Sequence, residues 1–162
     1  MSIIEQRGSA LHVEEGIIAH GCNALGFMGA GFALKIKQRF PAAFRAYKEQ
    51  QRHSGLVLGA VSFAQVGPSL WVANVITQER IYGRANEPLA DLDAIEQGMA
   101  IVGAKALALG LQVEMPLIGC GLAHGEWSVI LPRIEAGLGA ACGRAWVFEP
   151  EPRQGRAPAP RR

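Results

Sequence analysis

Short apolar runs rich in branched side chains recur along this 162-residue chain, separated by polar and glycine-containing segments. Runs of this length and composition are typical of buried β-strands. We therefore expect strands at GIIAH (16–20), AVSFAQV (60–66), WVANVIT (71–77), VEMPLI (113–118) and AWVFE (145–149), with SIIEQ (2–6) as a further candidate.

Between these runs, apolar positions recur at steps of three and four residues, which is the spacing of a helix that buries one face. Pro41 separates two such segments, as a break or as the first-turn residue of the second. Gly110 follows the longest segment, at the position where helices commonly end. The expected helices span residues 30–40, 41–52, 90–110 and 127–138.

The alternation of strands and helices predicts an α/β fold with three α/β/α layers around a mixed, largely parallel sheet. Residues 60–77 are a candidate for an antiparallel edge of that sheet. Ligands of such sheets bind outside the carboxyl ends of the strands. Two glycine-rich stretches, at 20–31 and 118–127, directly follow expected strands. They are the first places to look for a binding site.

Composition supports one soluble domain, because 49% of the residues are hydrophobic and 19% are charged. No apolar run approaches the roughly 18 residues needed to cross a membrane, and the N-terminus lacks a secretion signal. We expect a cytoplasmic protein without a membrane partner. The 3 cysteines are widely spaced and form no CxxC pair, so neither a disulfide framework nor a metal site is expected. No cofactor is indicated.

The positive charge is concentrated at the C-terminus. The whole chain carries +2, and residues 151–162 hold four Arg and one Glu, or +3, which leaves about −1 for the rest. A broad nucleic-acid-binding face on the domain is therefore not expected. We predict a domain over residues 1–149 and a disordered Pro/Arg-rich tail over 150–162, which is either a solvated end or an arm for weak nucleic-acid or partner contact.

The first glycine-rich stretch matches neither standard nucleotide motif. Gly26, Gly29 and Gly31 are spaced G-x-x-G-x-G, the reverse of the Rossmann order, and no Lys-Ser or Lys-Thr pair follows as in a Walker loop. Glycines nevertheless allow close backbone approach, and a helix starting near Ala30 directs N–H groups and its positive end at the loop. This arrangement favours an anion such as a phosphate.

The second stretch repeats the arrangement, with Gly119, Gly121 and Gly125 before a helix that begins near Trp127. A groove between two such loops suits a pyrophosphate, and Asn23 could hydrogen-bond the hydroxyls of an attached sugar. The alternative is that both stretches are only tight strand-to-helix turns.

Three sequence blocks then resemble a known family. HGCNALGFMGAGFALKIKQRFP (20–41), VANVITQERIYGR (72–84) and MPLIGCGLAHGEW (115–127) look like the macrodomain family, in its branch of ADP-ribose-1''-phosphate phosphatases and terminal ADP-ribose glycohydrolases. The likeness runs in order over residues 1 to 149. It implies a helix-flanked sheet with a cleft for ADP-ribose or a derivative at the strand ends, where Asn23 contacts the distal ribose.

The resemblance also implies ligand contacts from both glycine loops and from the segments beside them. The expected ligand-binding residues are Ser9, Cys22, Met28, Gly29, Ala30, Gly31, Gln78, Tyr82, Arg84, Ile118, Gly119, Cys120, Gly121, Leu122 and Ala123.

The chain departs from the family pattern at three of these positions. Ser9 stands where many macrodomains have an acid that accepts a hydrogen bond from the adenine amino group, so we expect selectivity for adenine to be weaker or to come from a backbone group. Gln78 and Ala123 stand where the glycohydrolases have a nucleophilic lysine and an assisting aspartate, so that covalent mechanism is not expected. Gln78, Tyr82-Gly83-Arg84 and Glu126-Trp127 instead match the pattern of the phosphatases.

His20, Asn23 and His124 are the catalytic candidates. An imidazole suits general acid or base work near neutral pH. The alternatives are that His20 is a buried, hydrogen-bonded residue and that His124 is simply solvated. Arg84 is either a phosphate ligand or solvated, and Tyr82 could close over a sugar or the adenine.

Other polar and aromatic residues have weaker indications. Asn74 could bind the ligand or satisfy a strand-end backbone group, and Glu126 could orient water or cap the following helix. The tryptophans Trp71, Trp127 and Trp146 are expected in the core. A catalytic cysteine is not expected.

The leading functional hypothesis is hydrolysis of ADP-ribose-1''-phosphate to ADP-ribose and phosphate. One alternative is removal of mono-ADP-ribose from protein or nucleic acid. The other is a non-catalytic reader that only binds ADP-ribose.

Overall fold

The computed structural model describes residues 3–85 and 87–147, which form a six-stranded sheet in the order β1-β6-β5-β2-β4-β3. All neighbouring strands are parallel except β3 and β4, which pair antiparallel at one edge. The predicted mixed sheet and its antiparallel edge within residues 60–77 are both confirmed. The strands are β1 (Ile3–Arg7), β2 (Gly16–Asn23), β3 (Val61–Gly67), β4 (Leu70–Gln78), β5 (Val113–Met115) and β6 (Gly143–Val147).

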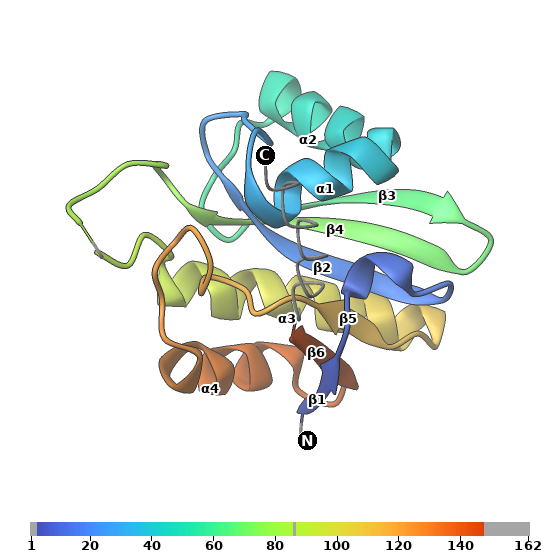
Figure 1. Ribbon diagram of the computed structural model, residues 1–162. Helices are drawn as coiled ribbons and strands as arrows, with labels where there is room; N and C mark the ends of the chain where they lie inside the picture. The colour runs from blue at the N-terminus through green and yellow to red at the C-terminus, as the bar shows by residue number, and fades with distance from the viewer. Residues whose placement is uncertain (1–2, 86, 148–162) are drawn as a thin grey trace, which may run out of the picture.

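Helices cover both faces of this sheet. Figure 1 shows α1 and α2 together on one side of the strands and α3 and α4 on the other. The expected helices are all present, with Pro41 in the first turn of α2 and Gly110 in the left-handed conformation after α3. The helices are the short 3₁₀ helix η1 (Ala10–His12) and α1 (Gly31–Arg39), α2 (Pro41–His53), α3 (Leu92–Leu109) and α4 (Trp127–Leu138).

Strand β2 lies in the middle of the core and is buried on both faces. Ile17 and Ala19 pack in the cluster that contains α3 and α4, whereas Ile18 packs in the cluster that contains α1 and α2. Successive side chains of a strand point to opposite faces, so a central strand covered on both sides needs apolar residues at every position. This explains the uninterrupted apolar run that marks the strand in the sequence.

Two strands end three residues away from the expected position. β2 continues to Asn23 rather than to residue 20, because the pairing with β4 extends through Cys22 and a buried hydrogen bond satisfies His20. β5 ends at Met115 rather than at residue 118, because Pro116 has no N–H to donate to the sheet. The polar residues of the first stretch therefore begin inside the strand.

The tail predicted at residues 150–162 lies outside the described residues. Within the described part of the chain, no helix is long and apolar enough to cross a membrane.

Candidate functional site

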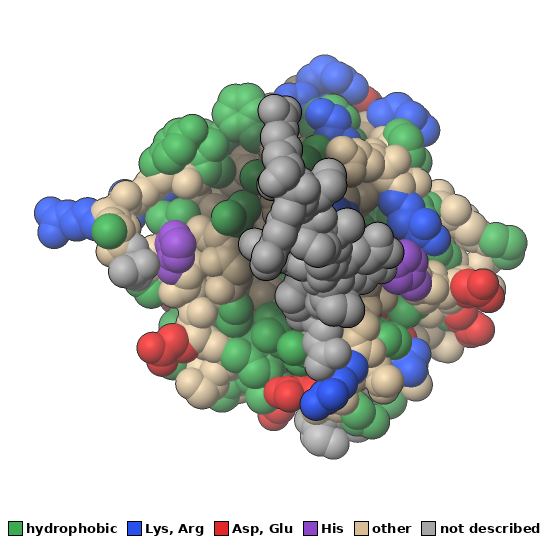
Figure 2. All heavy atoms as spheres, in the orientation of Figure 1, with side chains coloured by type: hydrophobic (Ala, Val, Ile, Leu, Met, Phe, Trp, Pro, Cys, Tyr) green, Lys and Arg blue, Asp and Glu red, His purple; other side chains and the backbone are tan. Residues whose placement is uncertain are grey.

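A cleft of about 1170 Å³ opens at the carboxyl ends of β2 and β4. Its walls are the first loop (residues 23–31) and the second loop (residues 116–125), and η1 and the end of β6 close its far end. In Figure 2, hydrophobic side chains gather beside a hollow on the left of the face, and acidic side chains lie toward the periphery. The volume is sufficient for a dinucleotide-sized ligand.

The two loops touch each other across the cleft. A Cβ atom added at Gly31 would lie 3.0 Å from Cδ1 of Leu122, so the loops approach closely only because residue 31 has no side chain. Helix α1 begins at Gly31, and no side chain caps its N-terminus. Its first backbone N–H groups therefore face the loop region without a side-chain acceptor, which suits an anion.

The first loop is built on the side chain of Asn23. Its Oδ1 accepts hydrogen bonds from the backbone N–H groups of Leu25 (3.0 Å) and Phe27 (3.3 Å), and its Nδ2 donates to the carbonyl of Phe27 (2.8 Å). Asn23 also lines the cleft, but its oxygen is committed to the loop. What remains for a ligand is the second hydrogen of the amide.

Tyr47 of α2 holds the same loop through hydrogen bonds of its hydroxyl group. Its hydroxyl donates to the carbonyl of Asn23 and accepts from the N–H of Gly26 at 3.1 Å, and the side chain is fully buried. Burial raises the pKa of Tyr47, so the phenol keeps its proton. The loop conformation is therefore supported by contacts within the protein.

The second loop is held by its own backbone. The N–H of Gly125 donates to the carbonyl of Gly119 at 2.7 Å, and that of His124 donates to Gly121 at 3.1 Å. Gly119 has φ +79° and His124 has φ +58°, a region that non-glycine residues rarely occupy. The exposed His124 is thus presented at the rim of the cleft by a strained backbone.

His20 forms part of the cleft floor. It is 1% exposed, and its Nε2 lies 2.7 Å from Oδ1 of Asn74. Asn74 uses its Nδ2 to donate to the carbonyl of Ala43 and to the hydroxyl of Ser62. Since Oδ1 of Asn74 must then be the acceptor, Nε2 of His20 carries the proton.

Burial lowers the pKa of His20 from 6.5 to about 4, and the hydrogen bond to Asn74 only partly opposes this. The ring is therefore neutral at physiological pH. This geometry favours the alternative of a buried, hydrogen-bonded histidine, although the ring also lines the cleft. Asn74 likewise satisfies interior polar groups instead of reaching into the cleft.

The cleft cysteines are poor nucleophiles. Burial raises the pKa of Cys22, which is 3% exposed, and also that of the half-buried Cys120. Since the thiolate is the reactive form, both thiols are held in the unreactive state.

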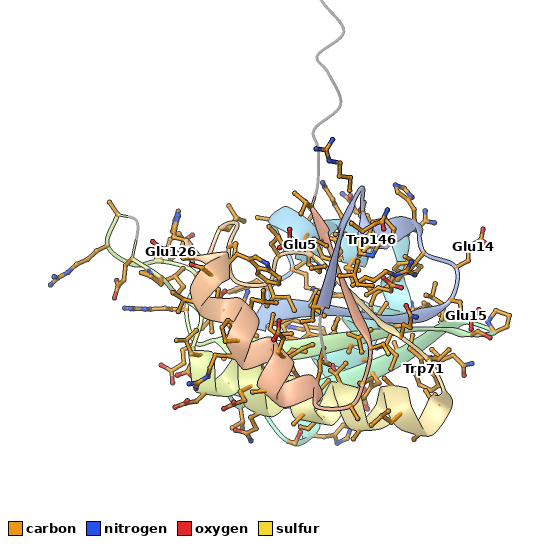
Figure 3. All side chains as sticks on the ribbon, turned by 90° about the horizontal axis from the view of Figure 1, so that it is seen from below. Glu5, Glu14, Glu15, Trp71, Glu126 and Trp146 are labelled. Carbon is orange, nitrogen blue, oxygen red and sulfur yellow. The ribbon has the colours of Figure 1, made fainter. Side chains whose placement is uncertain are left out.

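The far end of the cleft lies at Ser9 and Trp146. The Ser9 hydroxyl accepts from the N–H of Leu11 at 3.2 Å and so caps η1. The ring of Trp146, labelled in Figure 3, packs against Gly8, where an added Cβ would lie 3.3 Å from the ring. The indole Nε1 donates to the buried Glu114 at 2.6 Å. Trp146 is partly core, as expected, and also a wall of the cleft.

The structure gathers nearly all the expected site residues around this cleft. Two do not line it. Met28 is 1% exposed and packs in the core beside Tyr47, and Arg84 is exposed on the segment between β4 and α3. Glu126 also lies outside the lining, at the N-terminal end of α4 in Figure 3, and its side chain makes no capping hydrogen bond. The residues that do line it are Ser9, His20, Cys22, Asn23, Gly29, Ala30, Gly31, Gln78, Tyr82, Ile118, Gly119, Cys120, Gly121, Leu122, Ala123 and His124.

Several further lining residues were missed by sequence reasoning. Phe27 is 58% exposed between two glycines, a signal that could have been noticed. Thr77 belongs to one of the resembling blocks, as do Phe32, Lys35, Ile81 and Leu117. Trp146 and Val147 give no such signal. The missed residues include Phe27, Phe32, Lys35, Thr77, Ile81, Leu117, Trp146 and Val147.

The charge of the lining suits an anionic ligand. Among the described residues, no Asp or Glu lines the cleft, whereas Lys35 does. The described residues also contain no group of three or more His, Cys, Asp or Glu that could hold a metal ion.

Comparisons with known proteins place this geometry in context. No family model matches the chain. It is 33% identical to a macrodomain protein from Streptomyces coelicolor, with a TM-score of 0.73 over 92% of this chain and 99% of that one. It also resembles Thermosipho africanus DarTG in complex with ADP-ribose, at 19% identity and a TM-score of 0.71 over 93% of this chain and 42% of that one.

A curated relative adds a chemical description. The chain is 24% identical over 149 residues to a DNA ADP-ribosyl glycohydrolase of Thermus aquaticus. The match covers 89% of this chain but only 40% of the relative. The chain thus corresponds to less than half of that protein.

Proposed function

Because this chain belongs to the macrodomain family, we propose that its cleft binds ADP-ribose and that the protein releases phosphate from ADP-ribose-1''-phosphate. The observation that carries the proposal is the contact between two glycine loops over a cleft that no described carboxylate lines. Backbone N–H groups and glycines without carboxylates are the surroundings that a diphosphate requires.

In this proposal the diphosphate lies between the loops. It accepts hydrogen bonds from the start of α1 and from the backbone of residues 118–122. The free hydrogen of the Asn23 amide faces the distal ribose. The adenine lies toward Ser9 and Trp146, where the neutral Ser9 hydroxyl replaces a charged acceptor.

The reaction breaks the bond between phosphorus and the O1'' oxygen of the ribose and forms a new bond from phosphorus to a water oxygen. The leaving oxygen needs a proton, which the protonated imidazole of His124 supplies from the rim in this proposal. The protons of the attacking water leave on the released phosphate, which returns one to His124, so that the cycle closes. His20 cannot take that role at neutral pH, because its only proton is on Nε2 and is donated to Asn74.

The test measures phosphate release from ADP-ribose-1''-phosphate beside calorimetric binding of ADP-ribose. His124→Gln is expected to lower the rate by about tenfold or more while ADP-ribose still binds. His53→Gln is the matched control, since His53 is an exposed histidine on α2 that does not line the cleft. Binding without any phosphate release would reject the phosphatase and leave a reader or another hydrolase.

Removal of ADP-ribose from DNA is the second candidate, favoured by the activity named for the Thermus aquaticus relative. The covalent mechanism lacks its residues here. The amide of Gln78 donates to the carbonyl of Arg80 at 2.8 Å, and Ala123 presents only a methyl group. Release of ADP-ribose from an ADP-ribosylated oligonucleotide, with a salt-dependent loss on deleting residues 151–162, would support this candidate and the arm function of the tail.

A further inference from the structure

The strand pairing in the cleft floor contains an irregularity at Thr77. Cys22 of β2 pairs with Ile76 of β4, but the next residue, Asn23, pairs with Gln78. Thr77 therefore has no partner on β2 and is the extra residue of a β-bulge. Bulges occur beside functional sites because they redirect a side chain without ending the strand.

The redirected side chain points into space that Gly21 leaves open. A Cβ atom at Gly21 would lie 2.7 Å from Oγ1 of Thr77 and 3.5 Å from Cγ2 of Ile118. Thr77 thus lies between the end of β2 and the second loop, and it lines the cleft. The N–H of Asp91 donates to the Thr77 carbonyl at 2.7 Å and holds the bulge in place.

The hydroxyl group at this position does not help to hold the described part of the fold. Thr77 is only 1% exposed, and no hydrogen bond joins its Oγ1 to another described residue, yet Oγ1 is not among the completely buried atoms that lack a partner. A hydroxyl that no protein group satisfies needs contact with water or a ligand, because leaving it without either costs free energy. Since Thr77 lines the cleft, the cleft is where such a partner can reach it.

We propose that the Thr77 hydroxyl is a ligand-contacting group, which donates a hydrogen bond to an oxygen atom in the distal half of ADP-ribose. Three observations point there: the bulge turns Thr77 into the cleft, Gly21 makes room for it, and the fold itself does not use the hydroxyl. The distal half is indicated because Thr77 lies beside Ile118 of the second loop and next to the Asn23–Gln78 pair, away from Ser9 and Trp146. The inference rests on the proposed binding of ADP-ribose.

The test uses Thr77→Val, which removes the hydroxyl but keeps the branched shape, and Thr77→Ser, which restores a hydroxyl. Calorimetry with ADP-ribose should show about 3- to 10-fold weaker binding for Thr77→Val and a change within about twofold for Thr77→Ser. AMP, which lacks the distal half, should bind both variants as it binds the unaltered protein. ADP assigns the acceptor: an equal loss with ADP indicates the second phosphate, and no loss indicates the ribose.

Ligand-free unfolding separates this role from a structural one. Since the hydroxyl has no partner in the fold, Thr77→Val should have an unchanged or higher Tm. A lower Tm, or ADP-ribose binding by Thr77→Val equal to that of the unaltered protein, would overturn the proposal. If the unaltered protein itself fails to bind ADP-ribose, the proposed function fails first and this inference fails with it.

Discussion

The two glycine loops that wall the cleft look alike in sequence but are supported in different ways. The first loop, residues 23–31, rests on side chains: Asn23 organises it from within, and Tyr47 holds it from α2. The second loop, residues 116–125, rests on its own backbone hydrogen bonds and on close packing around its glycines.

The difference shows what each loop can tolerate. A loop supported by polar side chains is weakened when a partner atom is removed or when a proton disturbs the support. A loop supported by packing is weakened when an atom is added. The two walls of one cleft can therefore be held in place by two different physical routes.

The largest expected effect comes from protonating His20, which lies in β2, the strand that leads into the first loop. Its pKa is lowered from 6.5 to about 4 in the folded protein, so the unfolded chain takes up the proton first as the pH falls. The free energy of unfolding is therefore unaffected by protonation of His20 above about pH 6.5. Below that pH it falls progressively, by about 3 kcal/mol in total by the time the pH reaches about 4.

Denaturant unfolding from pH 7 to pH 4 measures this loss. His20→Gln keeps an amide that can donate to Asn74 but cannot titrate, so the pH dependence of its unfolding free energy should be smaller by that amount. If the unfolding free energies of the two proteins fell equally between pH 7 and pH 4, His20 would not be the source of the pH dependence.

The second effect tests the packed loop with one methyl group. In Gly125→Ala the added Cβ would lie 2.5 Å from the carbonyl oxygen of Gly119 and 2.6 Å from Cδ1 of Ile130. We expect a loss of about 2 to 3 kcal/mol of unfolding free energy, because backbone must move to relieve the overlap. Gly121→Ala is the control, since nothing lies within 4 Å of its added Cβ. Equal stability of the two variants would contradict the packing account.

The third effect tests the side-chain support of the first loop. Tyr47→Phe removes the hydroxyl that joins the Asn23 carbonyl to the Gly26 N–H, and about 2 kcal/mol of stability should be lost because these buried groups lose their partner. ADP-ribose affinity should fall as well. Lys48→Met removes only a longer bond of 3.3 Å to the Gly26 carbonyl and should cost within about 0.5 kcal/mol. If the Tyr47→Phe protein were as stable as the unaltered one, the first loop would not depend on the Tyr47 hydroxyl for its conformation.

The smallest effect concerns the strained backbone of the second loop. At φ +58°, glycine is favoured over alanine, so His124→Gly should be more stable than His124→Ala by about 1 kcal/mol, the reverse of the usual order. Thermal unfolding of the two variants measures the difference. Phosphate release should fall equally in both, because both lack the imidazole. A more stable His124→Ala would indicate that the left-handed conformation is not required.

Local patterns in the sequence were sufficient to predict the helices and strands and to locate the two glycine loops. The uninterrupted apolar run of β2 reflects burial on both faces, and Pro41 and Gly110 mark helix boundaries through their own backbone preferences. The glycines indicate where the chain turns or approaches another segment. Each of these signals depends on residues that are neighbours in the chain, so it can be read without the fold.

The tertiary structure decided which polar atoms are used up and which are left for a ligand. His20 meets Asn74 across 54 positions and Tyr47 meets Asn23 across 24, and the bulge that turns Thr77 depends on the register between two strands. Met28, expected among the ligand contacts from the family resemblance, packs in the core. Hydrogen-bond partners and side-chain direction depend on strand register and helix packing, which are non-local, and so only the folded chain specifies them.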